Sequence, residues 1–340
     1  MSKVLQVKSS EDFNLEELKR GQIHRLNIHI QKNALGIPWK IPLLVARGHV
    51  SGPTVGICAA IHGNELNGIP TIFKLFDLIN PKELKGTLVA APVVNIPGFL
   101  AGQREFSDKK DLNRVMPGKE KGTSSDMYAF HFAHKIIKKF DYLLDLHTAG
   151  AGKINSLYVR ADLSNEMCKK MALLQNPQII LNKYDEKGTL RAWANGQQIP
   201  TITIEIGNPS RFQHDLIDST LEGILNLMKH LKMMKGKVPH ESDLAQIVTC
   251  RKSYWVSTYT GGIIDVLPQL TERVQKNQII ARVYDVFGRI QDEIIAPENG
   301  IVIGKNTNPV CESGTRILHL GIYSRAKEKI PSTSLSKNSR

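Results

Sequence analysis

Two hydrophobic patterns alternate along the middle of the chain. Short apolar runs with the length of buried strands occupy residues 55–61, 87–94, 142–146, 157–159, 178–181 and 200–206. Longer segments with apolar residues every three or four positions occupy residues 66–79, 125–139, 163–174 and 214–234. Strands that alternate with helices of this kind are typical of α/β proteins. We therefore predict an α/β fold for residues 47–238.

The pattern changes near residue 240. After a predicted linker at residues 239–243, short β-like segments are separated by glycines. Residues 296–302 resemble the hairpin of biotinyl- and lipoyl-type barrels, but Asn299-Gly300 stands at the turn where such a domain carries its modified lysine. We predict a barrel-like β module without a prosthetic group, built from residues 239–325 and 1–46, with the strand-like segment 24–46 pairing into it. The Ser/Lys-rich residues 326–340 are expected to be a disordered tail.

Metal-binding residue types follow two of the predicted strands. His62 and Glu65 come directly after residues 55–61, with Gly63 permitting a tight turn between them, and His147 follows residues 142–146. Two imidazoles and one carboxylate are the ligand set of a catalytic zinc ion, which keeps one position open for water. A His and a Glu three residues apart are common. His62 could instead cap a helix, with Glu65 in the first turn interacting favourably with the helix dipole. The second histidine at a strand end favours one zinc ion per chain.

A further carboxylate lies inside an apolar strand. Glu205 is flanked by isoleucines and threonines, and a buried carboxylate needs a partner or a chemical role. A general base that activates water is such a role, whereas a glutamate on an edge strand would simply face solvent. Asp145 lies two residues before His147 and could orient its imidazole or belong to a turn. His131 and His134 are interpreted as ordinary helix residues.

Five motifs occur in a fixed order over roughly residues 40–325. They are H-G-N-E (62–65), D-L-N-R-V-M-P-G (111–118), D-L-H-T-A (145–149), G-T-L-R (188–191) and T-I-E-I-G (203–207). Together they resemble the succinylglutamate desuccinylase/aspartoacylase family, whose members are related to the zinc carboxypeptidases. Met116 departs from the aromatic residue that is usual in the family. The resemblance implies a carboxypeptidase-like mixed sheet with helices on both faces.

The resemblance also implies roles for individual residues. Glu205 matches the family's general base, and Asn113 and Arg114 match the pair that holds the substrate carboxylate. Arg104 matches more loosely the arginine that polarises the scissile carbonyl, although an exposed loop arginine is an alternative. Arg191 is expected to bind a second substrate anion.

Composition narrows the classes of function. The net charge of +13 raises the question of nucleic-acid binding, but the basic residues are dispersed, aromatic residues make up only 6% of the chain, and no nucleic-acid-binding signature is present. No apolar run has the length of a membrane span, and residues 1–20 lack the apolar region of a secretion signal. The four cysteines are far apart in sequence, which predicts reduced thiols and a cytoplasmic protein.

We therefore predict a zinc-dependent amide hydrolase that removes the acyl group from an N-acyl amino acid or a similar small carboxylate. We expect no nucleic-acid or membrane partner, and a homo-oligomer is compatible with the sequence. A metallocarboxypeptidase acting on a short or peptidoglycan peptide would need the same residues and is the alternative. A basic binding protein without catalysis is a third hypothesis, and the presence of all three ligands and Glu205 argues against it.

Overall fold

The computed structural model describes residues 7–183, 186–240, 242, 244 and 246–323. The predicted tail at residues 326–340 lies outside this part of the chain, as do two residues of the predicted linker.

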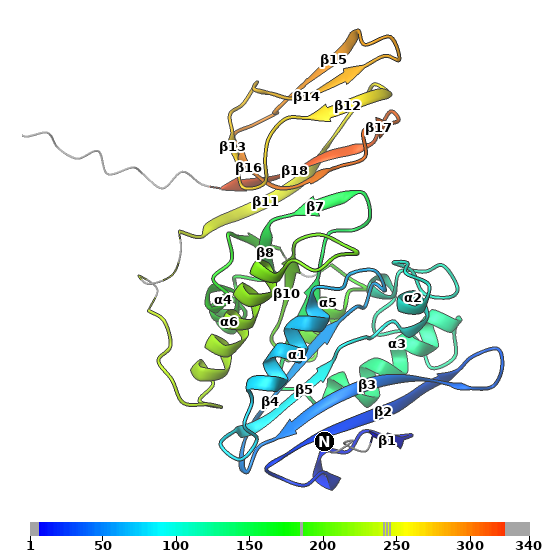
Figure 1. Ribbon diagram of the computed structural model, residues 1–340, viewed down its shortest axis with the longest axis vertical. Helices are drawn as coiled ribbons and strands as arrows, with labels where there is room; N and C mark the ends of the chain where they lie inside the picture. The colour runs from blue at the N-terminus through cyan, green and yellow to red at the C-terminus, as the bar shows by residue number, and fades with distance from the viewer. Residues whose placement is uncertain (1–6, 184–185, 241, 243, 245, 324–340) are drawn as a thin grey trace, which may run out of the picture.

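A large mixed sheet runs through the molecule (Figure 1). Its strands lie in the order β1-β2-β3-β5-β4-β6-β10-β8-β9-β11-β18-β16-β13, and β7 pairs with β16. Strands β5, β4, β6 and β10 run parallel, whereas β8 is antiparallel to β10. The strands of the first half are β1 (Val7–Ser10), β2 (Gln22–Lys32), β3 (Pro38–Arg47), β4 (Val50–Ala59), β5 (Lys85–Ala91), β6 (Tyr142–His147), β7 (Lys153–Asn155), β8 (Leu157–Ala161), β9 (Ile179–Asn182) and β10 (Thr201–Ile206).

Helices cover both faces of the parallel strands. Residues at alternate positions of β4 enter different cores: Val55 and Ile57 pack with α1, α4 and α6, and Cys58 packs with α3 and α5. Strands covered on both faces are near-continuous apolar runs, which explains why the sequence predicts them well. The helices are α1 (Gly68–Leu78), α2 (Ile96–Leu100), α3 (Ser124–Lys135), α4 (Glu166–Leu174), α5 (Leu190–Gly196) and α6 (His214–His230), with 3-10 turns η1 (Leu15–Glu17), η2 (Leu112–Arg114) and η3 (Ile137–Lys139).

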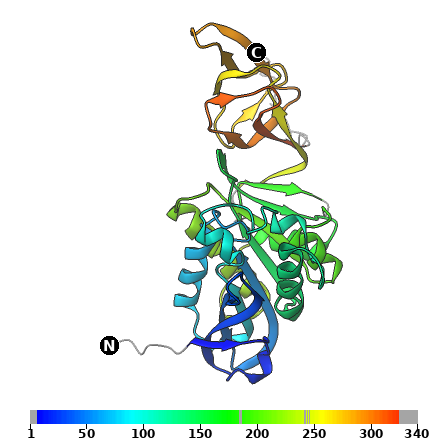
Figure 2. The same cartoon turned by 90° about the vertical axis from the view of Figure 1, so that its right-hand side faces the viewer.

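The C-terminal strands form a separate core of their own at one end of the molecule (Figure 2). Strands β11, β18, β16 and β13 extend the large sheet, and a separate sheet has the order β15-β14-β12-β17. Ile280 and Val283 of the separate sheet pack with Val302 and Leu318 of the large one. The bounds are β11 (Val248–Ser257), β12 (Gly262–Val266), β13 (Arg273–Val274), β14 (Ile279–Tyr284), β15 (Ile290–Ile295), β16 (Gly300–Asn306), β17 (Val310–Cys311) and β18 (Arg316–Tyr323).

The pairing predicted for residues 24–46 is wrong. These residues lie in β2 and β3, and β3 pairs with β5 at the end of the molecule opposite to the C-terminal strands (Figure 1). Two interactions hold β3 in this place. Its alternate apolar residues Leu43 and Val45 enter the core beneath α3. Its backbone pairs with the edge of β5 that would otherwise lack a neighbouring strand.

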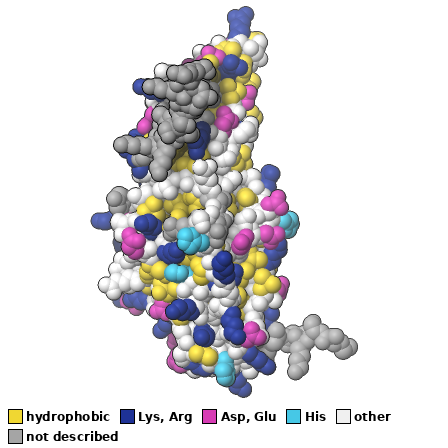
Figure 3. Space-filling model, turned by 90° about the vertical axis from the view of Figure 1, so that its left-hand side faces the viewer, with side chains coloured by type: hydrophobic (Ala, Val, Ile, Leu, Met, Phe, Trp, Pro, Cys, Tyr) yellow, Lys and Arg dark blue, Asp and Glu magenta, His cyan; other side chains and the backbone are white. Residues whose placement is uncertain are grey.

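The surface agrees with a dispersed positive charge. On the face shown in Figure 3, lysine and arginine side chains are scattered among acidic and apolar ones and do not gather into one patch. All four cysteines are buried free thiols. No helix in the described part of the chain is both long and apolar enough to cross a membrane.

Candidate active site

Three neighbouring strands present polar residues on a single face of the sheet. Ile202, Ile204 and Ile206 of β10 enter the core beneath α1, α4 and α6, so the residues between them point to the opposite face. Glu205 pairs with His147 of β6 on one side and with Tyr158 of β8 on the other. Residues paired across neighbouring strands share a face, and the sheet therefore assembles these three polar side chains directly.

The same register repeats two residues earlier along β10. Thr203 pairs with Asp145 of β6 and with Arg160 of β8. The resulting grid is two residues deep and three strands wide, and its six side chains lie on the face opposite to the core beneath α1, α4 and α6.

His62 and Glu65 come from the turn between β4 and α1. A side chain at Gly63 would place its Cβ 2.0 Å from the carbonyl carbon of Gly98, so only glycine fits between the turn and the neighbouring loop. The amide of Thr148 donates to Glu65 Oε2 at 3.0 Å and fixes this carboxylate beside His147. The turn thus lies at the carboxyl end of a parallel strand, where α/β sheets place their sites.

His62, Glu65 and His147 converge as the sequence predicts. His62 Nδ1 lies 2.8 Å from Glu65 Oε1, and His147 Nδ1 lies 2.9 Å from Glu65 Oε2. One ligand atom from each residue lies within 4.8 Å of the others, and all three side chains are buried. His62 Nδ1 is also a buried nitrogen whose contact with Glu65 lacks hydrogen-bond geometry. A nitrogen left without a hydrogen bond and facing a carboxylate suits a metal ligand, so these residues could hold a metal ion.

The outer nitrogen of each imidazole contacts a carboxylate. His62 Nε2 lies 2.9 Å from Asp111 Oδ1, and His147 Nε2 lies 2.9 Å from Asp145 Oδ2. Such contacts orient a metal-binding imidazole and raise its basicity. Of the two possibilities for Asp145, the contact with His147 is therefore the one found. Asp111 was not predicted, although it begins the D-L-N-R motif.

The charges of this cluster support one another. Burial raises the pKa of Glu65, but His62 and His147 outweigh burial and the pKa is strongly lowered. Burial lowers the pKa of His147, but Asp145 and Glu65 outweigh it and the pKa is raised. Arg104 donates to Glu65 Oε1 at 2.7 Å and to Asp111 Oδ2 at 2.8 Å. With both imidazoles neutral, as they must be to bind a metal ion, the carboxylates of Glu65, Asp111 and Asp145 outnumber the one guanidinium. A divalent cation would balance this excess of negative charge.

Glu205 lies in the middle of the sheet and not at an edge. Strands β6 and β8 flank β10, and Glu205 is only 8% exposed. Arg160 Nε donates to Glu205 Oε1 at 3.1 Å, and Asn155 Nδ2 donates to Oε2 at 3.2 Å. The alternative of a glutamate on an edge strand facing solvent is therefore excluded.

The three predicted substrate-binding residues line the same pocket as the metal-binding residues. Asn113 is buried, and its Oδ1 accepts a hydrogen bond from the amide of Leu190 at 2.7 Å. Arg114 is exposed, and its Nη1 donates to the carbonyl of Asn113 at 2.8 Å. Arg191 is buried at the start of α5 and donates to the carbonyl of Lys183 at 3.0 Å. His131 and His134 lie on α3, as expected, and are not among the residues that line this pocket.

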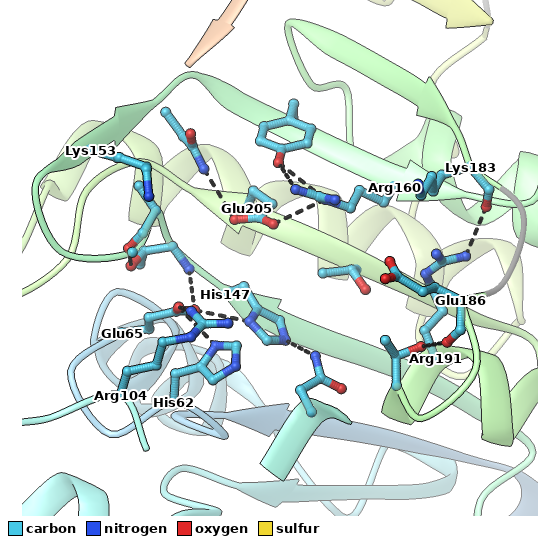
Figure 4. Close-up of a pocket in the computed structure, with 18 of the residues that line it drawn as sticks. His62, Glu65, Arg104, His147, Lys153, Arg160, Lys183, Glu186, Arg191 and Glu205 are labelled. Carbon is cyan, nitrogen blue, oxygen red and sulfur yellow. Dashed lines mark hydrogen bonds and ion pairs between the residues drawn. The ribbon is translucent and has the colours of Figure 1, made fainter. Parts of the chain in front are cut away.

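The pocket is strongly cationic. Figure 4 shows Glu205 between a metal-binding end and a second end that carries Arg160, Lys183 and Arg191. The lining contains six basic side chains, Arg104, Arg114, Lys153, Arg160, Lys183 and Arg191, and three acidic ones, Glu65, Glu186 and Glu205. Trp255 of β11 also lines the pocket, so the C-terminal strands contribute to its wall. An anionic ligand is the natural occupant of such a pocket.

Sequence reasoning missed several lining residues. Arg160 directly follows the predicted strand 157–159, and a charged residue in register with that strand was an available signal. Asn155, Lys153 and Lys183 had no comparable signal. Trp255 could not be assigned, because nothing local relates it to Lys153 and the other lining residues, which lie far earlier in the chain.

The chain resembles proteins of known family. Residues 51–231, more than half of the chain, match the succinylglutamate desuccinylase/aspartoacylase catalytic domain. The N-alpha-acetyl-L-2,4-diaminobutyric acid deacetylase of Halomonas elongata is 24% identical over 290 residues, which are 82% of this chain and 84% of that protein.

Solved structures share the fold. The product-bound ectoine utilization protein EutE of Ruegeria pomeroyi superposes with a TM-score of 0.80 at 22% identity, covering 90% of this chain and 97% of that one. A succinylglutamate desuccinylase/aspartoacylase from Rhodobacter sphaeroides superposes with a TM-score of 0.80 at 22% identity, covering 92% and 98%. Because the catalytic-domain match spans more than half of its length, the chain belongs to the succinylglutamate desuccinylase/aspartoacylase family.

Proposed function

We propose that the protein is a zinc-dependent deacylase that hydrolyses the amide bond of a small N-acyl amino acid. One observation carries the proposal. His62 and His147 turn their Nδ1 atoms toward Glu65 while their Nε2 atoms contact Asp111 and Asp145. Two histidines and one glutamate with outer carboxylate partners are typical of a catalytic zinc site with an open position.

The residues divide the reaction between them. Zinc held by His62, Glu65 and His147 would act as a Lewis acid and lower the pKa of water to roughly 7. Glu205 accepts the proton that the attacking water loses and then donates it to the leaving amine. Arg104, whose guanidinium lies against Glu65, donates to the substrate oxygen on which negative charge develops.

The cationic lining supports a substrate that carries a carboxylate. Asn113 and Arg114 together offer an amide and a guanidinium, which can bind a carboxylate through parallel hydrogen bonds. Arg191 offers a second guanidinium at the start of α5. The Halomonas elongata relative is a deacetylase of an N-acetyl amino acid, which agrees with this chemistry. Trp255 of the C-terminal strands lines the pocket as well, and a wall on that side favours a small molecule over a long peptide.

The proposal is tested by loading the purified protein with zinc and measuring amine release. N-acetyl-, N-succinyl- and N-aspartyl-type amides of several amino acids are compared with short peptides. We expect hydrolysis of at least one N-acyl amino acid and a loss of activity after chelation. Faster hydrolysis of peptides would favour the metallocarboxypeptidase, and binding without turnover would favour the non-catalytic alternative.

Arg114→Lys tests the carboxylate-binding role. A lysine ammonium cannot make the two parallel hydrogen bonds of a guanidinium, so we expect kcat/KM to fall. The fall should correspond to a loss on the order of 2–4 kcal/mol of transition-state stabilisation. The control is the same substrate with its carboxylate converted to an amide, on which the variant and the parent should differ little. Equal losses on both substrates would show that Arg114 has another role.

A further inference from the structure

The carboxylate of Glu205 is held at both of its oxygens. Arg160 Nε donates to Oε1 at 3.1 Å and Asn155 Nδ2 donates to Oε2 at 3.2 Å. Each carboxylate oxygen has two acceptor positions, so these two donors fix the plane of the carboxylate and leave capacity for a proton from water. A general base benefits from such a fixed orientation, because proton transfer needs the base within hydrogen-bond reach of its target.

Arg160 is itself fixed by a buried tyrosine. Its Nε and Nη2 both donate to the hydroxyl oxygen of Tyr158, and its guanidinium lies 5.3 Å from the centre of the Tyr158 ring. Tyr158 is fully buried and pairs with Glu205 across β8 and β10. The Arg160 side chain therefore reaches diagonally across the grid from the Thr203 position to Glu205. This diagonal path is set by the strand register and by Tyr158.

The C-terminal strands brace both donors. Asn155 lies on β7, which pairs with β16 opposite Gly304. A Cβ at Gly304 would lie 2.3 Å from Asn155 Oδ1 and 2.8 Å from the carbonyl oxygen of Ile154, so this close approach requires glycine. The backbone of β16 is thus in contact with the residue that holds Glu205 Oε2.

A second brace reaches Tyr158. The ring of His319 on β18 meets the Tyr158 ring edge-on, with 6.2 Å between the ring centroids. It stacks on the Trp255 ring of β11, with 5.1 Å between the centroids and 12° between the ring planes. Burial lowers the pKa of His319 to about 3, so the ring is neutral and packs as an aromatic group. Its Nε2 lies 2.8 Å from Ser253 Oγ, which fixes its orientation.

We propose that Arg160 and Asn155 are positioning residues that hold Glu205 in its working orientation, and that β16 and β18 of the C-terminal strands keep them in place. This inference rests on the proposed function, because it assigns to Glu205 the role of base. It gives the C-terminal strands a part in the reaction beyond lining the pocket. The same donors could instead bind substrate, and the experiments below separate the two roles.

Arg160→Met is measured alone and together with Glu205→Gln. Loss of orientation should lower kcat by roughly 10–100-fold and change KM by less than about threefold, because the base is misplaced while the substrate contacts remain. In the Glu205→Gln background the same change should have little further effect on kcat. Arg160→Lys, which keeps the charge but loses the fork of donors, should fall between the parent and Arg160→Met. Asn155→Ala should also lower kcat with little change in KM, but by a smaller factor than Arg160→Met.

Arg282→Met is a matched control. Arg282 Nε lies 3.0 Å from Glu293 Oε1 in the C-terminal sheet, outside the pocket lining, and we expect its loss to leave kcat and KM unchanged. An equal fall in kcat for Arg160→Met with and without the Glu205→Gln change would overturn the proposal. So would a dominant rise in KM, since it would make Arg160 a substrate-binding residue.

Melting temperatures test the same contact without turnover. Arg160→Met leaves the buried Glu205 carboxylate without its guanidinium. The change should therefore lower the melting temperature more in the parent protein than in the Glu205→Gln protein, where no carboxylate is left unpaired. If the two changes lowered the melting temperature additively, Arg160 and Glu205 would not stabilise each other, and the proposed contact would be contradicted. A parent protein that hydrolyses no amide would count against the proposed function alone, because the thermal cycle reads the Arg160–Glu205 contact independently.

Gly304→Ala tests the brace from β16. The new methyl group must displace Asn155 or the backbone of Ile154, and kcat should fall severalfold with little change in KM. Gly196→Ala is the control, since a Cβ there meets nothing within 4 Å. Equal activity of the two variants would show that β16 does not position Glu205.

Discussion

Glu205→Gln is expected to lower kcat by a factor of roughly 10²–10⁴ while the protein keeps its fold and about one zinc ion per chain. Glutamine has nearly the same shape as glutamate but cannot take a proton from water at neutral pH. Its side chain can still accept a hydrogen bond from Arg160 through its oxygen, so the strand register around β10 should survive. Steady-state kinetics and metal analysis on the same preparation measure both quantities.

The metal measurement separates the two roles that a buried glutamate can have. Glu293→Gln is the control, because Glu293 also pairs with an arginine but lies on β15 of the separate C-terminal sheet. Near-normal turnover of Glu205→Gln would remove Glu205 from the mechanism. Loss of zinc together with activity would make Glu205 a ligand and would reopen the role of Glu65.

His62→Ala and His147→Ala are each expected to abolish stoichiometric zinc and nearly all activity. Each change removes one of three ligands and also the imidazole that an outer carboxylate contacts, which is Asp111 for His62 and Asp145 for His147. Metal content after gel filtration, together with hydrolysis of the best substrate, is the measurement. The parent should hold about one zinc ion per chain.

His134→Ala is the matched control for the loss of an imidazole. His134 stacks on Phe130 at 4.1 Å on α3 and does not line the pocket, so its variant should keep zinc and activity. Asp111→Asn should weaken zinc binding by roughly 10–100-fold, because a carboxylate that orients a ligand contributes about that much. Stoichiometric zinc in a protein that lacks both His62 and His147 would refute the metal site.

Local pattern determined much of this fold. Each predicted central strand and helix has a counterpart, with ends that differ by a few residues: the segment 214–234 ends as a helix at His230, and the segment 55–61 belongs to a longer strand that ends at Ala59. Strands buried on both faces are nearly continuous apolar runs, and the long helices carry an apolar stripe. Both patterns can be recognised in the sequence and predict where these elements lie. The short α5 was not predicted, since seven residues give too little periodicity.

The ligand set of the site was also visible in sequence. His62, Glu65 and His147 follow strands whose carboxyl ends meet at one edge of the sheet, so their convergence could be expected before any coordinates. Glu205 was visible because a charge inside an apolar strand is unusual. These residues are determined by position relative to a strand, which is local information.

Only the tertiary structure decided which distant segments meet. Residues 24–46 have the alternation of a half-buried strand wherever they pair, and the free edge of β5 beneath α3 settled their place. The contacts of Asp111 with His62, of Arg160 and Asn155 with Glu205, and of Trp255 with the pocket join segments far apart in the chain. Strand pairing and packing set such contacts. The local pattern shows which face of a strand is buried but not which strand lies beside it, because every residue type except proline offers the same backbone donor and acceptor.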